Sequence, residues 1–295
     1  MRLERLGQPA FLRYDIARIA WGVYRNGRYD DQEVDIQLRQ LDARAFSRVE
    51  SSLLENGVIH PVQGMPDRSA FSLLGANTSD KNSLACIIDP FSYLSHLSAM
   101  EFHGLTDRMP EKIYVSTPAS TTWTGFARDR MKRDLGEDLP AYLSGGLPKL
   151  ERVNAIKIGQ RPIHRFASLH LGAFRTIKES QLRVSTIGRT FHDMLRDPGL
   201  CGGLAHVLEV YREHASKYRR LIFDQLDQQD SAIDKVRAGF ILENICDLKD
   251  PRIDSWVKFA ARGGSRKLDP SSEYAPHFSD RWCLSINIGI PAKES

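Results

Sequence analysis

The sequence predicts an α+β protein in which an N-terminal winged helix-turn-helix precedes a larger mixed α/β domain. Apolar residues recur at helical spacing near the N-terminus, two strand-like segments follow them, and helical and strand-like patterns are mixed thereafter. At 295 residues the chain is long enough for two domains. We expect the winged helix at 1–75, a polar linker at 76–84 and the α+β domain at 85–295.

Three helices are expected in the first part of the chain. Residues 9–24 repeat apolar side chains at helical spacing until an Asn-Gly pair interrupts the pattern. A second helix, over about 31–41, begins with acidic residues that suit the positive end of the helix dipole. A third, over 43–57, follows an aspartate and ends at a second Asn-Gly pair.

A hairpin is expected directly after the third helix. Residues 58–62 and 70–74 have the composition of strands, and 63–68 between them contain glycine and proline. Helices followed at once by a hairpin are typical of a winged helix, in which the hairpin is the wing.

The remaining sequence mixes both element types. Helical patterns are expected at 90–105, 189–197, 203–228 and 231–246, and strands at 112–116, 183–186 and 282–290. This mixture favours an α+β domain.

The third helix has the character of a DNA-recognition helix. Phe46, Val49 and Leu53 lie on one side of its helical wheel, and basic and hydroxyl residues lie opposite. In a helix-turn-helix the second helix of the pair enters the major groove, where arginine bonds guanine and serine donates to bases or phosphates. The expected DNA-binding residues are Arg39, Arg44, Ser47, Arg48, Ser51 and, at the wing tip, Arg68. Alternatively, the two arginines of the third helix are only the solvated face of an amphipathic helix.

Cysteine content and the distribution of apolar residues argue against several other classes of protein, whereas the net charge leaves nucleic-acid binding open. The net charge of +4 permits nucleic-acid binding without establishing it, and residues 1–75 hold about ten basic and ten acidic residues. The four cysteines lie far apart with no CxxC pair, so neither a zinc site nor a disulfide framework is indicated. The first residues lack an apolar signal-peptide core, and no apolar run approaches the roughly 18 residues of a membrane span. A cytoplasmic protein with no membrane partner is expected.

From Asp89 onward the sequence resembles the AbiEi family, the antitoxins of type IV toxin-antitoxin and phage-abortive pairs. The similar segments, in order, are PFSYLS (90–95), SAMEFHGL (98–105), KIYV (112–115), RVST (183–186), RTFHDML (189–195), DPGLCGG (197–203) and KVRAGFILE (235–243). The resemblance implies a repressor of its own operon that binds inverted repeats in double-stranded operator DNA. It also implies a C-terminal domain that counteracts a nucleotidyltransferase-like toxin, without requiring a stable complex.

A glycine-containing loop near the C-terminus is a second candidate contact. Arg262, Ser265, Arg266 and Lys267 flank or follow a double glycine whose N–H groups could cradle a phosphate. The alternative is a structural turn that carries solvated charges, since the Walker pattern is absent.

No enzyme motif stands out in the sequence. The patterns GxSxG, HExxH, CxxC and GxGxxG are absent. His103, His192 and His206 lie on apolar-rich helices near acidic residues, where structural histidines are expected. We therefore expect no catalytic residue, metal or cofactor. The alternative function is a winged-helix-bearing nuclease or nucleotide-handling enzyme of a defence system.

Overall fold

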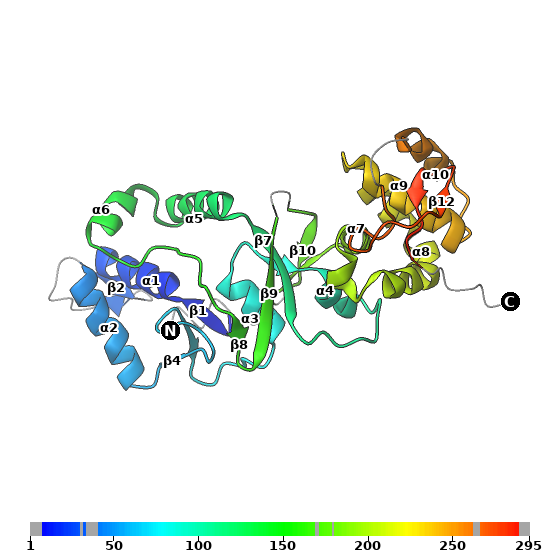
Figure 1. Cartoon of the computed structure of the whole chain (residues 1–295). Helices are drawn as coiled ribbons and strands as arrows, with labels where there is room; N and C mark the ends of the chain where they lie inside the picture. Colours follow the sequence, from blue (N-terminus) through cyan, green and yellow to red (C-terminus); the bar gives the residue numbers. More distant parts are fainter. Residues whose placement is uncertain are drawn as a thin grey trace. The chain divides into compact units, whose positions relative to one another are not determined.

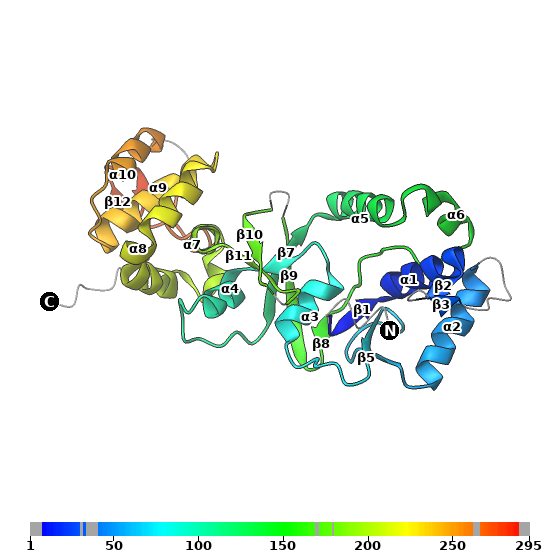
Figure 2. The same cartoon turned by 180° about the vertical axis from the view of Figure 1, so that it is seen from behind.

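The computed structural model of the chain divides into two compact units. It describes residues 8–29, 32–33, 41–168, 171–178, 180–261 and 266–288 (Figures 1 and 2). Unit 1 comprises Met1–Leu94, Glu111–Leu171 and Thr176–Arg183, and unit 2 comprises Ser95–Pro110, Gly172–Arg175 and Val184–Ser295. The expected linker at 76–84 therefore lies inside unit 1, and its last residues belong to the helix α3 (Lys81–Ile88).

The N-terminal part of unit 1 is a small antiparallel sheet with helices. Its elements are β1 (Ala10–Leu12), α1 (Arg13–Asn26), β2 (Arg28–Tyr29), β3 (Gln32–Glu33), α2 (Ala43–Glu55), β4 (Ile59–Pro61) and β5 (Ala70–Leu73). The strand order is β1-β5-β4, so the expected hairpin of β4 and β5 is present and β1 joins it at the β5 edge.

The structure corrects two of the expected helices. Residues 10–12 are a strand rather than the start of a helix, because Phe11 pairs with Phe71 and both side chains are fully buried in the sheet. Gly27, at φ 61°, ends α1 in a left-handed conformation. Where the second helix was expected, β3 pairs with β2. The rest of that expected helix, 34–40, lies outside the described residues.

The remaining elements of unit 1 form a second sheet and further helices. After α3 these are β6 (Tyr93–Leu94), β7 (Ile113–Pro118), α5 (Ser120–Leu135), the 3₁₀ turn η2 (Gly136–Asp138), α6 (Leu139–Ser144), β8 (Lys157–Ile158) and β9 (Arg161–Ser168). The strands follow the order β6-β7-β9-β8, with β7 and β9 parallel. The chain passes between the units within β10 (Phe174–Thr176) and β11 (Arg183–Ser185).

Helices α5 and α6 are fastened to α1. The Tyr14 hydroxyl donates to Asp134 over 3.1 Å, and Arg130 donates to Asp15 over 3.0 Å. Tyr142 of α6 meets the Tyr14 ring edge to face with ring centroids 6.3 Å apart. Burial, reinforced by Asp134, raises the pKa of Tyr14, so its phenol stays a proton donor. Figure 1 shows α5 and α6 beside α1 in this unit.

The β4–β5 loop packs back onto the second sheet of unit 1. Gly159, in the turn between β8 and β9, donates its N–H to the carbonyl of Gln63 over 3.1 Å. Gly64 has φ +83°, and a Cβ there would lie 3.0 Å from the Gly159 nitrogen. This backbone approach fixes one side of the loop within unit 1.

Unit 2 is mainly helical. Its elements are α4 (His96–Phe102), α7 (Ile187–Arg196), the 3₁₀ turn η3 (Pro198–Cys201), α8 (Leu204–Asp227), α9 (Ala232–Phe240) with its π-helical continuation η4 (Ile241–Ile245), α10 (Pro251–Trp256), the 3₁₀ turn η5 (Val257–Phe259), β12 (Phe278–Ser279) and β13 (Leu284–Ser285). The three long helical patterns expected after residue 189 are confirmed. Phe191, Tyr211, Phe223, Trp256 and Trp282 belong to its core.

Two other elements expected in this part of the chain are shorter in the structure than the sequence predicts. The helix expected at 90–105 covers only α4, because Tyr93 and Leu94 pair with β7 first. The strand expected at 282–290 is reduced to Leu284 and Ser285, which pair with the two residues of β12. Residues 286–288 are not strand, and 289–290 lie outside the described residues.

The mixed helix and sheet content agrees with the expected α+β class. None of the helices described combines the length and the hydropathy needed to cross a lipid bilayer. All four cysteines are free thiols, and burial raises the pKa of Cys86 and Cys201.

Candidate nucleic-acid interface

Helix α2 has a buried side and an exposed side, as its sequence pattern predicts. Asp42 begins the helix by accepting a hydrogen bond from the Ala45 N–H over 2.8 Å. Ala45 and Phe46 are buried. Arg44, Ser47 and Arg48 are exposed, and Ser51 is half-buried.

The two arginines of this face are not neutralised by neighbouring groups. Arg44 and Arg48 lie four residues apart, about one helical turn, so their side chains share one face of α2. Neither forms an ion pair or a hydrogen bond with any residue that the structure describes. The exposed acidic residue of α2 is Glu55, which lies at the last position of the helix, beyond both arginines. Positive charge is therefore concentrated in the first two turns.

A buried carboxylate on the opposite side of α2 fixes the helix within unit 1. Glu50 is fully buried and accepts two hydrogen bonds from Arg13, Nε to Oε1 over 2.7 Å and Nη2 to Oε2 over 3.0 Å. The Arg13 guanidinium also lies over the Phe46 ring, 5.5 Å from its centre. Because a buried charge is costly unless paired, this bidentate contact holds α2 against the junction of β1 and α1.

Arg68 belongs to the same cluster, which changes how its predicted role is understood. Its Nη1 lies 3.4 Å from Oε2 of Glu50, and its side chain is 46% exposed. The backbone of Arg68 adopts φ 51°, in the left-handed region. The expected wing-tip contact therefore points partly back to α2, and only the exposed part of its guanidinium is free for other groups.

Two of the first three backbone amides of α2, those of Ala43 and Ala45, already have partners. Ala43 donates its N–H to the carbonyl of Gly145, in the loop after α6, over 2.9 Å. The next capped amide, on Ala45, is held by Asp42. Since two of the first three amide donors are used, a phosphate at this helix would be bound mainly by side chains.

The second candidate loop lies in unit 2 and is only partly described. Arg262 and Ser265 fall outside the described residues, as does Arg39 of the N-terminal region. Arg266 donates to the Phe259 carbonyl over 2.8 Å, and Lys267 donates to the Ser272 carbonyl over 2.7 Å. Both cations thus bond to main-chain groups of unit 2, as in a structural turn.

Each histidine considered for catalysis has a polar contact within unit 2; His192 and His206 are buried and His103 is half-buried. His192 is 1% exposed and its Nε2 lies 2.8 Å from Oδ2 of Asp234. His103 Nε2 lies 2.7 Å from the Ser185 carbonyl, and burial lowers its pKa. His206 Nε2 lies 2.9 Å from the Thr106 hydroxyl. These contacts match structural roles.

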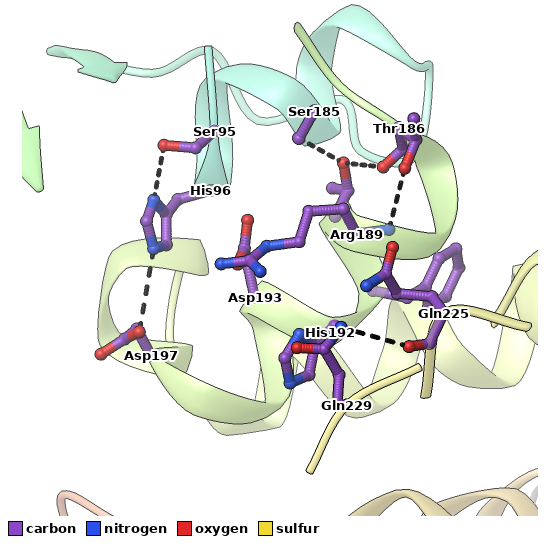
Figure 3. A network of polar contacts seen from close by, with 12 residues as sticks. Ser95, His96, Ser185, Thr186, Arg189, His192, Asp193, Asp197, Gln225 and Gln229 are labelled. Atoms are coloured by element: carbon purple, nitrogen blue, oxygen red, sulfur yellow. Dashed lines mark hydrogen bonds and ion pairs between the residues drawn. The ribbon is translucent and has the colours of Figure 1, made fainter. Parts of the chain in front are cut away.

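A polar network surrounds α7 inside unit 2 (Figure 3). Arg189 donates to Asp193 over 2.7 Å, and each side chain is 3% exposed. On the facing segment, His96 contacts the Ser95 hydroxyl at 2.8 Å and Asp197 at 3.9 Å. The network joins α4 and α7 within one unit. Among the described residues, no group of three or more His, Cys, Asp or Glu side chains is arranged to hold a metal ion.

The sequence pattern alone did not identify the cluster of Arg13, Glu50 and Arg68. A usable signal was present, because Glu50 lies four residues after Phe46 and therefore on the apolar face of the helix. A charged residue on a buried helix face requires a partner, and Arg13 comes directly after the apolar strand β1.

No family model matches the sequence, and no curated protein does. Among solved structures, the chain is similar to the Rv2827c protein from Mycobacterium tuberculosis, with a TM-score of 0.47 and 12% sequence identity. That similarity covers 91% of this chain and 89% of the other.

Proposed function

We propose that this chain is a DNA-binding regulator of the AbiEi antitoxin type. In this proposal α2 enters the major groove of inverted repeats in double-stranded operator DNA, and the chain represses its own operon. Its second function is to counteract a nucleotidyltransferase-like toxin.

The observation that carries the DNA-binding proposal is the unpartnered basic face of α2. Arg44 and Arg48 are exposed and make no ion pair with described residues, whereas Arg13 is committed to a buried carboxylate of the same helix. Exposed guanidinium groups on a fixed helix meet the requirements of major-groove contact. The hairpin of β4 and β5 directly after α2 adds support, because the wing of a winged helix was expected at this place in the chain.

The proposal includes one departure from the usual motif. Residues 27–42 lie between α1 and α2, whereas the helices of a helix-turn-helix are commonly joined by a turn of about 3–4 residues. The β2–β3 ladder occupies part of this connection. We therefore assign groove contacts to α2 and not to the connection.

The test is DNA binding measured by fluorescence anisotropy, with a labelled duplex from the region upstream of the gene. Arg44→Ala and Arg48→Ala are each expected to weaken binding by about 1–3 kcal/mol if the side chain reads a base. If the residue instead contacts phosphate, binding weakens for all sequences and the slope of log affinity against log salt falls by about 1.

The matched control is Arg133→Ala, which removes another exposed arginine, from α5 of the same unit. Its affinity for DNA should equal that of the parent protein. Parent-like binding by both α2 variants would exclude α2 as the DNA contact. Magnesium-dependent cleavage of the labelled duplex in the same assay would favour the nuclease alternative.

The antitoxin function is supported by the similar segments from residue 90 onward. The test is growth of cells that express the nucleotidyltransferase-like toxin, which this proposal expects to be encoded beside the chain's own gene, with and without this chain. Growth is expected to be restored by the chain and also by its Arg44→Ala variant, because toxin neutralisation does not use α2. No restoration by the parent chain would contradict this part of the proposal without affecting the DNA measurement.

A further inference from the structure

A pocket in unit 1 lies between α5, α6 and the extended segment that follows α6. Its volume is about 390 Å³, within the range of about 300–1,000 Å³ typical of small-molecule sites. Half of the twelve lining residues are apolar: Trp123, Ala127, Met131, Leu139, Leu143 and Leu150. Figure 1 shows the same three elements, α5, α6 and the following segment, along one side of the unit.

Two cations at this pocket have no partner among the described residues. Arg128 comes from α5 and Lys149 from the extended segment, so the two charges come from different elements. Both are exposed and neither forms an ion pair with a described residue. Glu151 is the carboxylate among the lining residues, and with Arg152 the lining carries more positive than negative charge.

The inner end of the pocket carries a further hydrogen-bond donor. Arg152 lies over the Trp123 ring at 5.3 Å, and its Nη2 donates to the Thr117 hydroxyl over 3.2 Å. Its Nε is buried and has no hydrogen-bond partner among the described residues. The half-buried Arg152 guanidinium adds a third positive charge to the pocket lining.

The floor of the pocket is held in place by a buried carboxylate. Asp89 accepts hydrogen bonds from Trp123 Nε1 over 2.8 Å and from the Thr117 hydroxyl over 2.6 Å. Trp123 is 3% exposed, so its ring is packed against other side chains while its Nε1–H is bonded to Asp89. The side chain is therefore fixed in position. A preformed floor lowers the ordering cost of ligand binding.

We propose that this pocket binds a small amphipathic anion, a molecule with a carboxylate or sulfonate on an apolar body. The apolar body would lie against Trp123 and Met131, and the anionic group would lie near Arg128, Lys149 and Arg152. Charge complementarity selects this ligand class over neutral apolar molecules, because two of these cations have no other partner.

The test uses 8-anilinonaphthalene-1-sulfonate, whose fluorescence rises in apolar surroundings, and decanoate as an aliphatic competitor. One saturable site is expected, with displacement by decanoate and not by decanol. Arg128→Met and Lys149→Met should each weaken binding on the order of tenfold, since each removes one charge-assisted contact. Thr124→Trp, at the exposed rim of α5, should block the site.

The matched control is Lys132→Met, which removes an exposed cation from α5 outside the pocket lining and should leave the affinity for the probe unchanged. Circular dichroism and thermal unfolding establish that each variant is folded. Equal binding by the parent, the charge variants and Thr124→Trp would overturn the proposal. Conversion of a dimer to a monomer by Thr124→Trp, without saturable probe binding by the parent, would overturn it in favour of a second copy as the occupant. DNA affinity is measured without the probe, so this proposal and the proposed function can fail independently.

Discussion

The outer face of α2 and the interior beside α7 show two opposite uses of arginine. Arg44 and Arg48 lie four residues apart in exposed positions and have no partner among the described residues. Arg189 and Asp193 have the same spacing, but both are buried and bonded to each other. Sequence spacing is identical in the two cases, so burial and pairing distinguish a candidate contact from a structural ion pair.

The largest effect is expected when the buried pair beside α7 is broken. Arg189→Met should lower the free energy of unfolding by about 3–5 kcal/mol, because Asp193 would keep a buried charge without its partner. The Oδ2 atom of Asp193 already has no hydrogen-bond partner among the described residues. Urea unfolding followed by circular dichroism measures the change.

The double variant Arg189→Met with Asp193→Leu is the control for that prediction. It removes both charges and should recover most of the stability, as replacement of buried ion pairs by apolar residues often does. A loss below about 1 kcal/mol in the single variant would mean that the pair is not buried as described.

The next largest effect concerns the cluster that holds α2. Glu50→Gln should lower the free energy of unfolding by about 1–3 kcal/mol, since charge-assisted bonds from Arg13 are lost while the side-chain shape is kept. Thermal unfolding in low and high salt measures it.

Arg68→Ala should have a smaller effect than Arg13→Ala, because Arg68 contacts Glu50 at 3.4 Å and Arg13 does so through two shorter bonds. The reverse order would show that the hairpin, and not the β1–α1 junction, holds the helix.

A smaller effect is expected in acid. Burial raises the pKa of Asp234, but its hydrogen bond to His192 and the charge of that histidine outweigh burial, so the net pKa is lowered from its ordinary value of 3.8. A lowered carboxyl pKa contributes stability above the unfolded value, and this contribution is lost as pH falls through the folded value. As pH falls below about 4, the free energy of unfolding of Asp234→Asn should therefore decrease less than that of the parent protein. Asp230→Asn, an exposed aspartate nearby in sequence, should retain the parent profile; the same smaller decrease in both variants would remove Asp234 as the cause.

The smallest effect is expected at the end of the exposed face of α2. Glu55→Gln should strengthen DNA binding about twofold at low salt, because it removes a negative charge near the phosphates, and the gain should shrink as salt is added. The anisotropy assay measures it, with Glu137→Gln of η2 as the control. Weaker binding by Glu55→Gln would indicate that Glu55 accepts a hydrogen bond from a base.

Local sequence patterns predicted the elements that are marked by regularly spaced apolar residues or by turn residues. The 3.6-residue periodicity was sufficient for α2, α7 and α8, and the turn residues between β4 and β5 were sufficient for their hairpin. The pattern failed for Ala10–Leu12, since three consecutive apolar residues fit a helix and a buried strand equally well. It also missed β9, whose strand identity depends on parallel pairing with a distant segment.

The exposed residues of the candidate interface could be predicted from the sequence, whereas the contacts that occupy part of this interface could not. Amphipathic spacing was enough to separate Arg44 and Arg48 from Phe46. The contact of Arg68 with Glu50, and that of Ala43 with Gly145, join residues far apart in the sequence. Such contacts leave no periodic trace in a single sequence, and the same is true of the pocket bordered by Arg128 and Lys149.

Unit 1 is assembled from three separate stretches of chain, and this order constrains both biosynthesis and protein engineering. Helices α5 and α6, which cover Tyr14 and Asp15 of α1, are made only after the chain has passed through Ser95–Pro110 of unit 2. A ribosome must therefore release about half of the protein before the N-terminal part of unit 1 can complete its core. A fragment that stops near residue 85 would lack this cover and expose apolar surface, so domain-swap or reporter fusions should keep the chain through Arg183.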